Sequence, residues 1–186
     1  MKIIYLHGFK DSEASASDKG KLLAEKLGAI TPEIPVNPLD AIRQLDNLIQ
    51  ELSSARVCLF GHSLGGFYAS HLATKYNLPC ILTNPSVHPQ DHWLLPEILK
   101  DTPELIEPMQ AAFTSLDRPI TNPEMFLVLV QRGDSLLDYR QAVEHYNDCN
   151  LVILRGGSHA FNDYTEWLHI TEHFYNLKLK ELNHGD

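Results

Sequence analysis

The segment Gly61-His62-Ser63-Leu64-Gly65-Gly66 is the strongest indication of fold in this chain. It follows the apolar run Val57–Phe60 and precedes a helix-like stretch that ends at Tyr76. The pattern G-x-S-x-G between a strand and a helix is typical of a nucleophile elbow, in which a strained turn holds a serine hydroxyl clear of the sheet. Glycine at positions 61 and 65 lets the strand and the helix pass close together without Cβ clashes.

Two other interpretations of this segment are a glycine-rich turn without chemistry and a phosphate-binding loop. A dinucleotide-binding loop would have the pattern G-x-G-x-x-G, and a P-loop would have Gly-Lys followed by Ser or Thr. Neither pattern is present in the segment. The flanking strand and helix therefore favour Ser63 as a nucleophile.

Strands and helices alternate along the chain. Continuous apolar strands joined by helices indicate a parallel sheet that is covered on both faces. We therefore predict an α/β fold with a mostly parallel sheet of about six strands flanked by helices. The expected strands are Ile3–Leu6, Ala29–Pro35, Val57–Phe60, Cys80–Thr83, Met125–Val130 and Leu151–Leu154. Pro32 interrupts the second of these, which is therefore expected at an edge of the sheet.

Length and charge limit the possible classes of protein. The chain has 186 residues, 44% of them hydrophobic, which fits a single domain over residues 1–186. Its formal net charge of −9 argues against binding to nucleic acid or to anionic membranes. We find no signal peptide and no apolar run long enough to span a bilayer. The expectation is a soluble cytoplasmic protein, and its oligomeric state stays open.

Residues 86–124 interrupt the alternation of strands and helices. This segment holds six of the eleven prolines together with many large apolar residues, which predicts short helices folded over the strand ends. We interpret it as a lid-like insertion, because open α/β sheets bind ligands at the carboxyl ends of their strands. The alternative is a packed connection that completes the core. The candidates for substrate contact are Trp93, Leu94, Leu95, Ile98 and Met109.

A nucleophilic serine needs a base and an acid that orients the base. In α/β-hydrolases these follow the serine in the order Asp or Glu, then His. Here Asp134 follows one predicted strand, and His159 follows the last one after two glycines. Asp138 is a rival acid, but it lies where a helix would begin and is expected to cap that helix. We therefore predict Ser63, Asp134 and His159 as the catalytic residues.

When the serine attacks an acyl carbonyl, negative charge develops on the carbonyl oxygen, and two N–H donors are needed to stabilise this oxyanion. One is expected from the backbone of Leu64, directly after the nucleophile, and the other from the loop after the first strand. That loop begins His7-Gly8-Phe9, and Phe9 is the expected donor. His7 is expected to orient the loop rather than to act as a second base.

The chain resembles the YqiA-type esterases, a compact α/β-hydrolase group long carried as an uncharacterised protein family. The resemblance rests on these segments: Tyr5–Phe9, Ser63–Gly66, Asn84-Pro85, Gly133-Asp134 with Leu137–Ala142, and Gly157–Phe161. It implies a compact α/β-hydrolase fold, with Ser63, Asp134 and His159 as the triad. It also implies esterase activity on short acyl esters, with acyl thioesters as the other substrate class. The match is weakest over residues 86–124.

These observations together predict a carboxylic ester hydrolase that cleaves small-molecule acyl esters or thioesters of short to medium chain length through an acyl-enzyme. The histidines form no H-E-x-x-H pattern, so we expect no metal, and no other cofactor is needed. Two alternatives are a catalytically silent binding protein on the same fold and another triad reaction, such as hydrolysis of a C–C bond.

Overall fold

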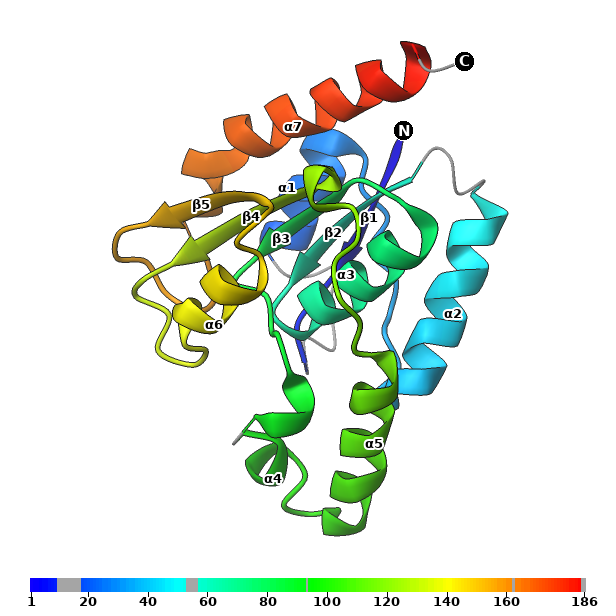
Figure 1. Cartoon of the computed structure of the whole chain (residues 1–186), viewed down its shortest axis with the longest axis vertical. Coiled ribbons are helices and arrows are strands. Elements are labelled where there is room, and N and C mark those ends of the chain that lie inside the picture. The colour runs from blue at the N-terminus through cyan, green and yellow to red at the C-terminus, as the bar shows by residue number, and fades with distance from the viewer. Residues whose placement is uncertain (10–17, 53–56, 93, 162, 185–186) are drawn as a thin grey trace.

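A single parallel sheet organises the molecule (Figure 1). The computed structural model describes residues 1–9, 18–52, 57–92, 94–161 and 163–184. The strands of the sheet are β1 (Lys2–Leu6), β2 (Val57–His62), β3 (Cys80–Thr83), β4 (Phe126–Gln131) and β5 (Asn150–Leu154). They lie in chain order, and each is parallel to its neighbours. All five carboxyl ends therefore meet at one edge of the sheet.

Helices connect and cover the strands. They are α1 (Asp18–Leu27), α2 (Pro38–Glu51), α3 (Leu64–Tyr76), α4 (Leu94–Ile98), α5 (Ile106–Leu116), α6 (Tyr139–His145) and α7 (Tyr164–His184). Local signals set several of the ends. Gly28 follows α1 at φ +63, as expected for a left-handed cap. Asn37 caps α2 by accepting hydrogen bonds from the backbone N–H groups of residues 39 and 40.

The two faces of the sheet carry separate apolar clusters, because successive strand residues point to opposite faces. Ile4 and Leu6 pack with residues of α2, α3, α5 and α6 on one face. Ile3 and Tyr5 pack with Leu23 of α1 and with α7 on the other. Figure 1 shows α1 and α7 together on one side of the sheet, with α2, α3 and α6 on the opposite side. The predicted α/β architecture with both faces covered is confirmed.

The described residues form five strands rather than about six, and all of their pairings are parallel. The predicted strand Ala29–Pro35 is reduced to one bridge, in which Ile30 pairs with Ile4 of β1. The N–H of Ile30 donates to the oxygen of Ile3, and the N–H of Tyr5 donates to the oxygen of Ile30. Proline cannot donate to a strand ladder, so Pro32 and Pro35 prevent a longer strand. The edge position of this segment was predicted correctly.

The segment 86–124 folds as short helical pieces. Besides α4 and α5 it contains the 3₁₀ turns η2 (Pro89–Asp91) and η3 (Pro103–Leu105) and the start of η4 (Pro123–Met125). Figure 1 shows α4 and α5 projecting away from the sheet, below the strands. His88 and Asp117 join the two ends of this projection, with 2.9 Å between Nδ1 and Oδ2. The prediction of short helices is therefore confirmed.

Candidate active site

Ser63 lies in the turn between β2 and α3 with φ 53° and ψ −124°. A positive φ is uncommon for residues other than glycine and marks strain that often accompanies a functional site. The neighbouring glycines are sterically required. A Cβ on Gly61 would stand 2.6 Å from the oxygen of Gly65, and a Cβ on Gly65 would stand 2.5 Å from the oxygen of His7. The segment therefore forms the strained strand-to-helix turn that its sequence predicts.

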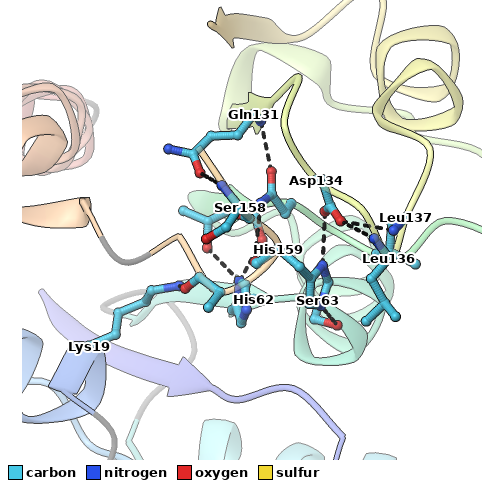
Figure 2. Close-up of polar contacts among 12 residues, drawn as sticks. Lys19, His62, Ser63, Gln131, Asp134, Leu136, Leu137, Ser158 and His159 are labelled. Carbon is cyan, nitrogen blue, oxygen red and sulfur yellow. Dashed lines mark hydrogen bonds and ion pairs between the residues drawn. The ribbon is translucent and has the colours of Figure 1, made fainter. Parts of the chain in front are cut away.

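The side chain of His159 lies between those of Ser63 and Asp134 (Figure 2). Its Nε2 is 3.0 Å from Oγ of Ser63, and its Nδ1 is 2.9 Å from Oδ2 of Asp134. When Nδ1 is protonated and donates a hydrogen bond to the carboxylate of Asp134, Nε2 can accept a hydrogen bond from the hydroxyl of Ser63. The structure thus brings together the three side chains that the sequence predicts as a triad.

Asp134 is held in place by its own loop. Its side chain is 2% exposed, and its Oδ1 accepts hydrogen bonds of 2.9 Å from the N–H groups of both Leu136 and Leu137. Burial alone would raise the pKa of this carboxyl group. The hydrogen bonds from His159, Leu137 and Leu136 outweigh burial and hold the pKa below its ordinary value. Asp134 is therefore a fixed, ionised partner for His159.

The rival acid Asp138 has a different position. It caps α6, accepting a hydrogen bond of 3.0 Å from the N–H of Arg140, and it pairs with the Arg140 guanidinium at 3.3 Å. Asp163, a further acid near the site, precedes α7. Its carboxylate accepts hydrogen bonds from Gln131 Nε2 at 2.6 Å and Trp167 Nε1 at 3.3 Å. The prediction that Asp138 caps a helix is confirmed.

The residues predicted to stabilise the oxyanion lie on both sides of Ser63. Leu64 is the first residue of α3, whose amino end is a favourable environment for negative charge. The loop after β1 is close by, because a Cβ on Gly8 would stand 3.2 Å from Cβ of Ser63. Phe9 and Leu64 both line the cavity that contains Ser63. Their role as N–H donors stays a prediction.

Two residues beside the triad were not singled out by their sequence context. His62 packs its ring against that of His159, with 5.3 Å between the centroids, and its Nδ1 is 3.0 Å from the oxygen of Thr83. Burial, with the charges of Lys19 and His159, lowers the pKa of His62 well below 6.5, so its ring is neutral. Lys19 donates to the oxygen of Ala160 at 3.1 Å. The only sequence feature that could have indicated either residue is that His62 directly precedes Ser63.

A cavity of about 1010 Å³ opens beside Ser63 and His159 and reaches the segment 86–124. Leu95 and Ile98 line it. Their predicted contact with the substrate stays a prediction. Met109 is buried in the core and is not among the described lining residues. Leu94 begins α4, but its side chain is not described, and Trp93 lies outside the described residues. His92, Phe113, Leu136 and Leu137 also line the cavity, although they were not predicted to do so.

Within the described ranges, no group of three or more His, Cys, Asp or Glu side chains is arranged to hold a metal ion. No helix in that part of the chain is both long and apolar enough to cross a membrane.

Comparison with solved structures identifies the class of fold. Est1E from Butyrivibrio proteoclasticus, solved with ferulic acid bound, superposes with a TM-score of 0.71 at 16% identity. The match covers 98% of this chain and 89% of Est1E. Mouse alpha/beta hydrolase domain-containing protein 10 gives a TM-score of 0.71 at 13% identity, over 96% of this chain and 90% of the mouse protein. The protein therefore has the α/β-hydrolase fold.

Sequence comparison identifies the family. The model of the uncharacterised protein family UPF0227 matches residues 2–176, and the chain belongs to this family. A UPF0227 protein of Yersinia enterocolitica is 28% identical over 149 residues, which are 75% of this chain and 78% of that protein. A UPF0227 protein of Pectobacterium atrosepticum is 26% identical over 149 residues, 76% of this chain and 80% of the relative.

Proposed function

We propose that the protein is a serine esterase that cleaves short- to medium-chain acyl esters through an acyl-enzyme. The observation that carries this proposal is the continuous contact from Asp134 through His159 to Ser63, at 2.9 and 3.0 Å. A serine hydroxyl becomes a competent nucleophile when an oriented base accepts its proton. The likeness to Est1E supports a small carboxylic acid or ester as ligand, because that neighbour holds ferulic acid.

In the proposed mechanism, Nε2 of His159 takes the proton from Ser63 as its Oγ attacks the acyl carbonyl carbon. Asp134 keeps the Nδ1 proton in place and stabilises the imidazolium that forms. The N–H groups of Leu64 and Phe9 would donate to the oxyanion; removing one such donor typically lowers the rate about 10²–10³-fold. His159 then gives this proton to the leaving oxygen or sulfur as its bond to the acyl carbon breaks, and the group departs as an alcohol or thiol. Water repeats the sequence to release the acid and regenerate Ser63.

The acyl chain is proposed to lie against the segment 86–124, in one hydrolase domain with that segment as its lid. Leu95 and Ile98 supply apolar cavity wall on this side, with Leu136 and Leu137 from the loop that carries Asp134. Apolar walls favour acyl groups by about 0.8 kcal/mol for each buried methylene. A cavity of about 1010 Å³ is at the upper end of the size range for small-molecule sites, so it has room for acyl groups well beyond acetyl.

The competing proposal from another class is a silent binding protein on the same fold. The strained turn at Ser63 argues against it, because a binding protein would not need its serine in a costly conformation next to an oriented imidazole. Cleavage of a C–C bond by the same triad is a second alternative, for which the structure supplies no separate support.

A substrate panel tests the proposal. The purified protein is assayed with p-nitrophenyl esters from acetyl to decanoyl and with acyl-CoA thioesters of the same lengths, with Ser63→Ala as the control. The proposal predicts turnover by the wild type and none above background by Ser63→Ala. Equal rates for the two proteins would reject it. Activity on thioesters alone would change the proposed substrate class from esters to thioesters and leave the proposed mechanism unchanged.

A further inference from the structure

His159 reaches Ser63 across two intervening strands. Ser63 follows β2, whereas the loop that carries His159 follows β5, and β3 and β4 lie between these two strands. The loop therefore has to run along the carboxyl edge of the sheet before His159 can contact Ser63. Residues at the ends of β4 and β3 hold this part of the loop.

The first support is Gln131, the last residue of β4, which is fully buried. Its Oε1 accepts a hydrogen bond of 2.9 Å from the N–H of Ser158, and its Nε2 donates to Asp163 at 2.6 Å. The carboxamide also lies against the backbone of Gly157, where an added Cβ would overlap it and where φ is +79°. Figure 2 shows Gln131 bonded to the Ser158 backbone beside His159.

The second support is Asn84, which follows β3 and is 3% exposed. Its Nδ2 donates to the oxygen of Ser158 at 2.9 Å and to the oxygen of His159 at 3.2 Å. Its Oδ1 accepts a hydrogen bond of 2.8 Å from the N–H of Gln131. One buried carboxamide thus joins the ends of β3 and β4 to the two backbone carbonyl groups that flank the Cα of His159.

We propose that Asn84 is a positioning residue that fixes the backbone of His159, with Gln131 holding the preceding residue. This inference rests on the proposed function, because it assigns Asn84 a part in the serine hydrolase reaction. The imidazole is supported by a loop rather than by a helix or strand, so its position depends on these backbone contacts. A displacement of about 1 Å in a reacting group can lower a rate about 10²-fold. Asn84 acts on the reaction through His159 and contacts neither Ser63 nor Asp134 in the hydrogen bonds described.

The backbone at Asn84 allows a clean substitution. Its φ is +40°, a region that glycine adopts without strain and that Asn and Asp tolerate better than most other residues. Asn84→Gly therefore suits the turn while it removes the Nδ2 donor. Asn84→Asp keeps the size of the side chain and the acceptor for Gln131, but places an oxygen against the oxygens of Ser158 and His159.

Asn77 supplies a matched control. It has φ 52°, ends α3 as a left-handed cap, and accepts a side-chain hydrogen bond of 2.9 Å from Asn122. Asn77→Gly is the same substitution in a similar backbone conformation, and it also removes a hydrogen-bonding partner. It does not touch the loop of His159. A loss that arises only from weaker folding should therefore appear in both variants.

The experiment measures kcat and KM for p-nitrophenyl butyrate, together with Tm and hydrogen exchange of the peptide that contains residues 157–161. We expect Asn84→Gly and Asn84→Asp to lower kcat by about 10²-fold with KM changed less than about threefold. Exchange in the 157–161 peptide should be faster in both variants. Asn77→Gly should keep the wild-type kcat whatever its Tm. If Asn84→Gly does not fold, kcat and hydrogen exchange of Asn84→Asp alone test the role of Asn84.

A wild-type kcat in folded Asn84→Gly and Asn84→Asp would overturn the inference, as would an equal loss of kcat in Asn77→Gly. A wild-type protein without hydrolase activity would instead reject the proposed function. In that case hydrogen exchange still tests the support of the loop: unchanged exchange in the Asn84 variants contradicts it, and faster exchange confined to residues 157–161 upholds it.

Discussion

The hydroxyl oxygen of Ser63 lies 3.0 Å from Nε2 of His159, although 96 residues separate the two in the chain. Parallel topology explains this contact, because it places the ends of β2 and β5 at one edge of the sheet. The loop after β5 completes the approach by crossing the ends of β4 and β3. The predicted nucleophile in a strained turn and the predicted base in a supported loop are thus held together by parts of the fold that are remote in sequence.

The two acids near this site should differ in their effect on catalysis. Asp134→Asn replaces the acceptor for Nδ1 of His159 with a group that can donate to it, which favours the wrong imidazole tautomer. We expect kcat for p-nitrophenyl butyrate to fall about 10⁴-fold, as in other triads. Asp138→Asn should keep activity within about twofold, because asparagine caps a helix as well as aspartate does.

Stability measurements separate the roles of these acids further. Asp138→Ala, which removes the cap of α6, should lower the free energy of unfolding by about 1 kcal/mol without loss of kcat. If Asp138→Asn were inactive and Asp134→Asn active, Asp138 would be the functional carboxylate.

The neutral state of His62 predicts how stability depends on pH. Burial lowers the pKa of His62 well below 6.5 in the folded protein. As pH falls below about 6.5, the unfolded chain therefore becomes protonated at His62 while the folded protein does not. The free energy of unfolding should therefore decrease as pH falls below about 6.5, by up to about 1.4 kcal/mol per pH unit for one such group. Burial also lowers the pKa values of His71, His92 and His145, which adds to the decrease.

Urea unfolding of the wild type and of His62→Gln at pH 8, 7, 6 and 5 measures this contribution. The variant removes the titrating ring, so its stability should fall less steeply between pH 6.5 and 5, even if it is less stable at pH 8. Identical slopes for the two proteins would show that His62 is not held neutral by the fold.

Leu95 should control the preference for acyl chain length. It lines the cavity near Ser63, and Leu95→Ala removes apolar surface that a longer acyl chain would contact. We expect kcat/KM to fall for hexanoyl and octanoyl p-nitrophenyl esters and to stay near the wild-type value for the acetyl ester. Each lost methylene contact corresponds to about 0.8 kcal/mol, or roughly fourfold in kcat/KM.

Met109→Ala is the control for this prediction. Met109 is as buried as Leu95 but belongs to the core rather than to the described cavity wall. Its truncation should lower stability by about 2–5 kcal/mol and leave the chain-length profile parallel to that of the wild type. A profile for Leu95→Ala that is also parallel would mean that the segment 86–124 only completes the core.

The sequence predicted those parts of the site that depend on local pattern. Each of three features follows an apolar strand: the turn at Ser63, the loop that carries Asp134, and the glycines before His159. Parallel topology therefore brings them to one edge of the sheet. The cap at Asp138 was equally local. Strand length was less predictable, since the prolines in Ala29–Pro35 left only the Ile30 bridge.

Long-range polar contacts escaped prediction. Asn84 and Gln131 contact the His159 loop at sequence separations of 74 and 27 residues, and no local sequence pattern predicts either contact. Lys19 reaches Ala160 across 141 residues in the same way. Met109 was expected at the substrate because it lies in an apolar insertion, but helix α5 turns it into the core. Which face of a short helix is buried depends on its neighbours and not on its own sequence.

We propose above that Ser63 is the nucleophile and that His159 activates it. The most direct test is covalent labelling with a fluorophosphonate probe, followed by mass spectrometry of the labelled peptide. The wild type should be modified stoichiometrically at Ser63, with parallel loss of esterase activity. Ser63→Ala should not be labelled, and His159→Ala should be labelled far more slowly. Labelling at another residue, or none in an active wild-type protein, would contradict the assignment of Ser63 as the nucleophile.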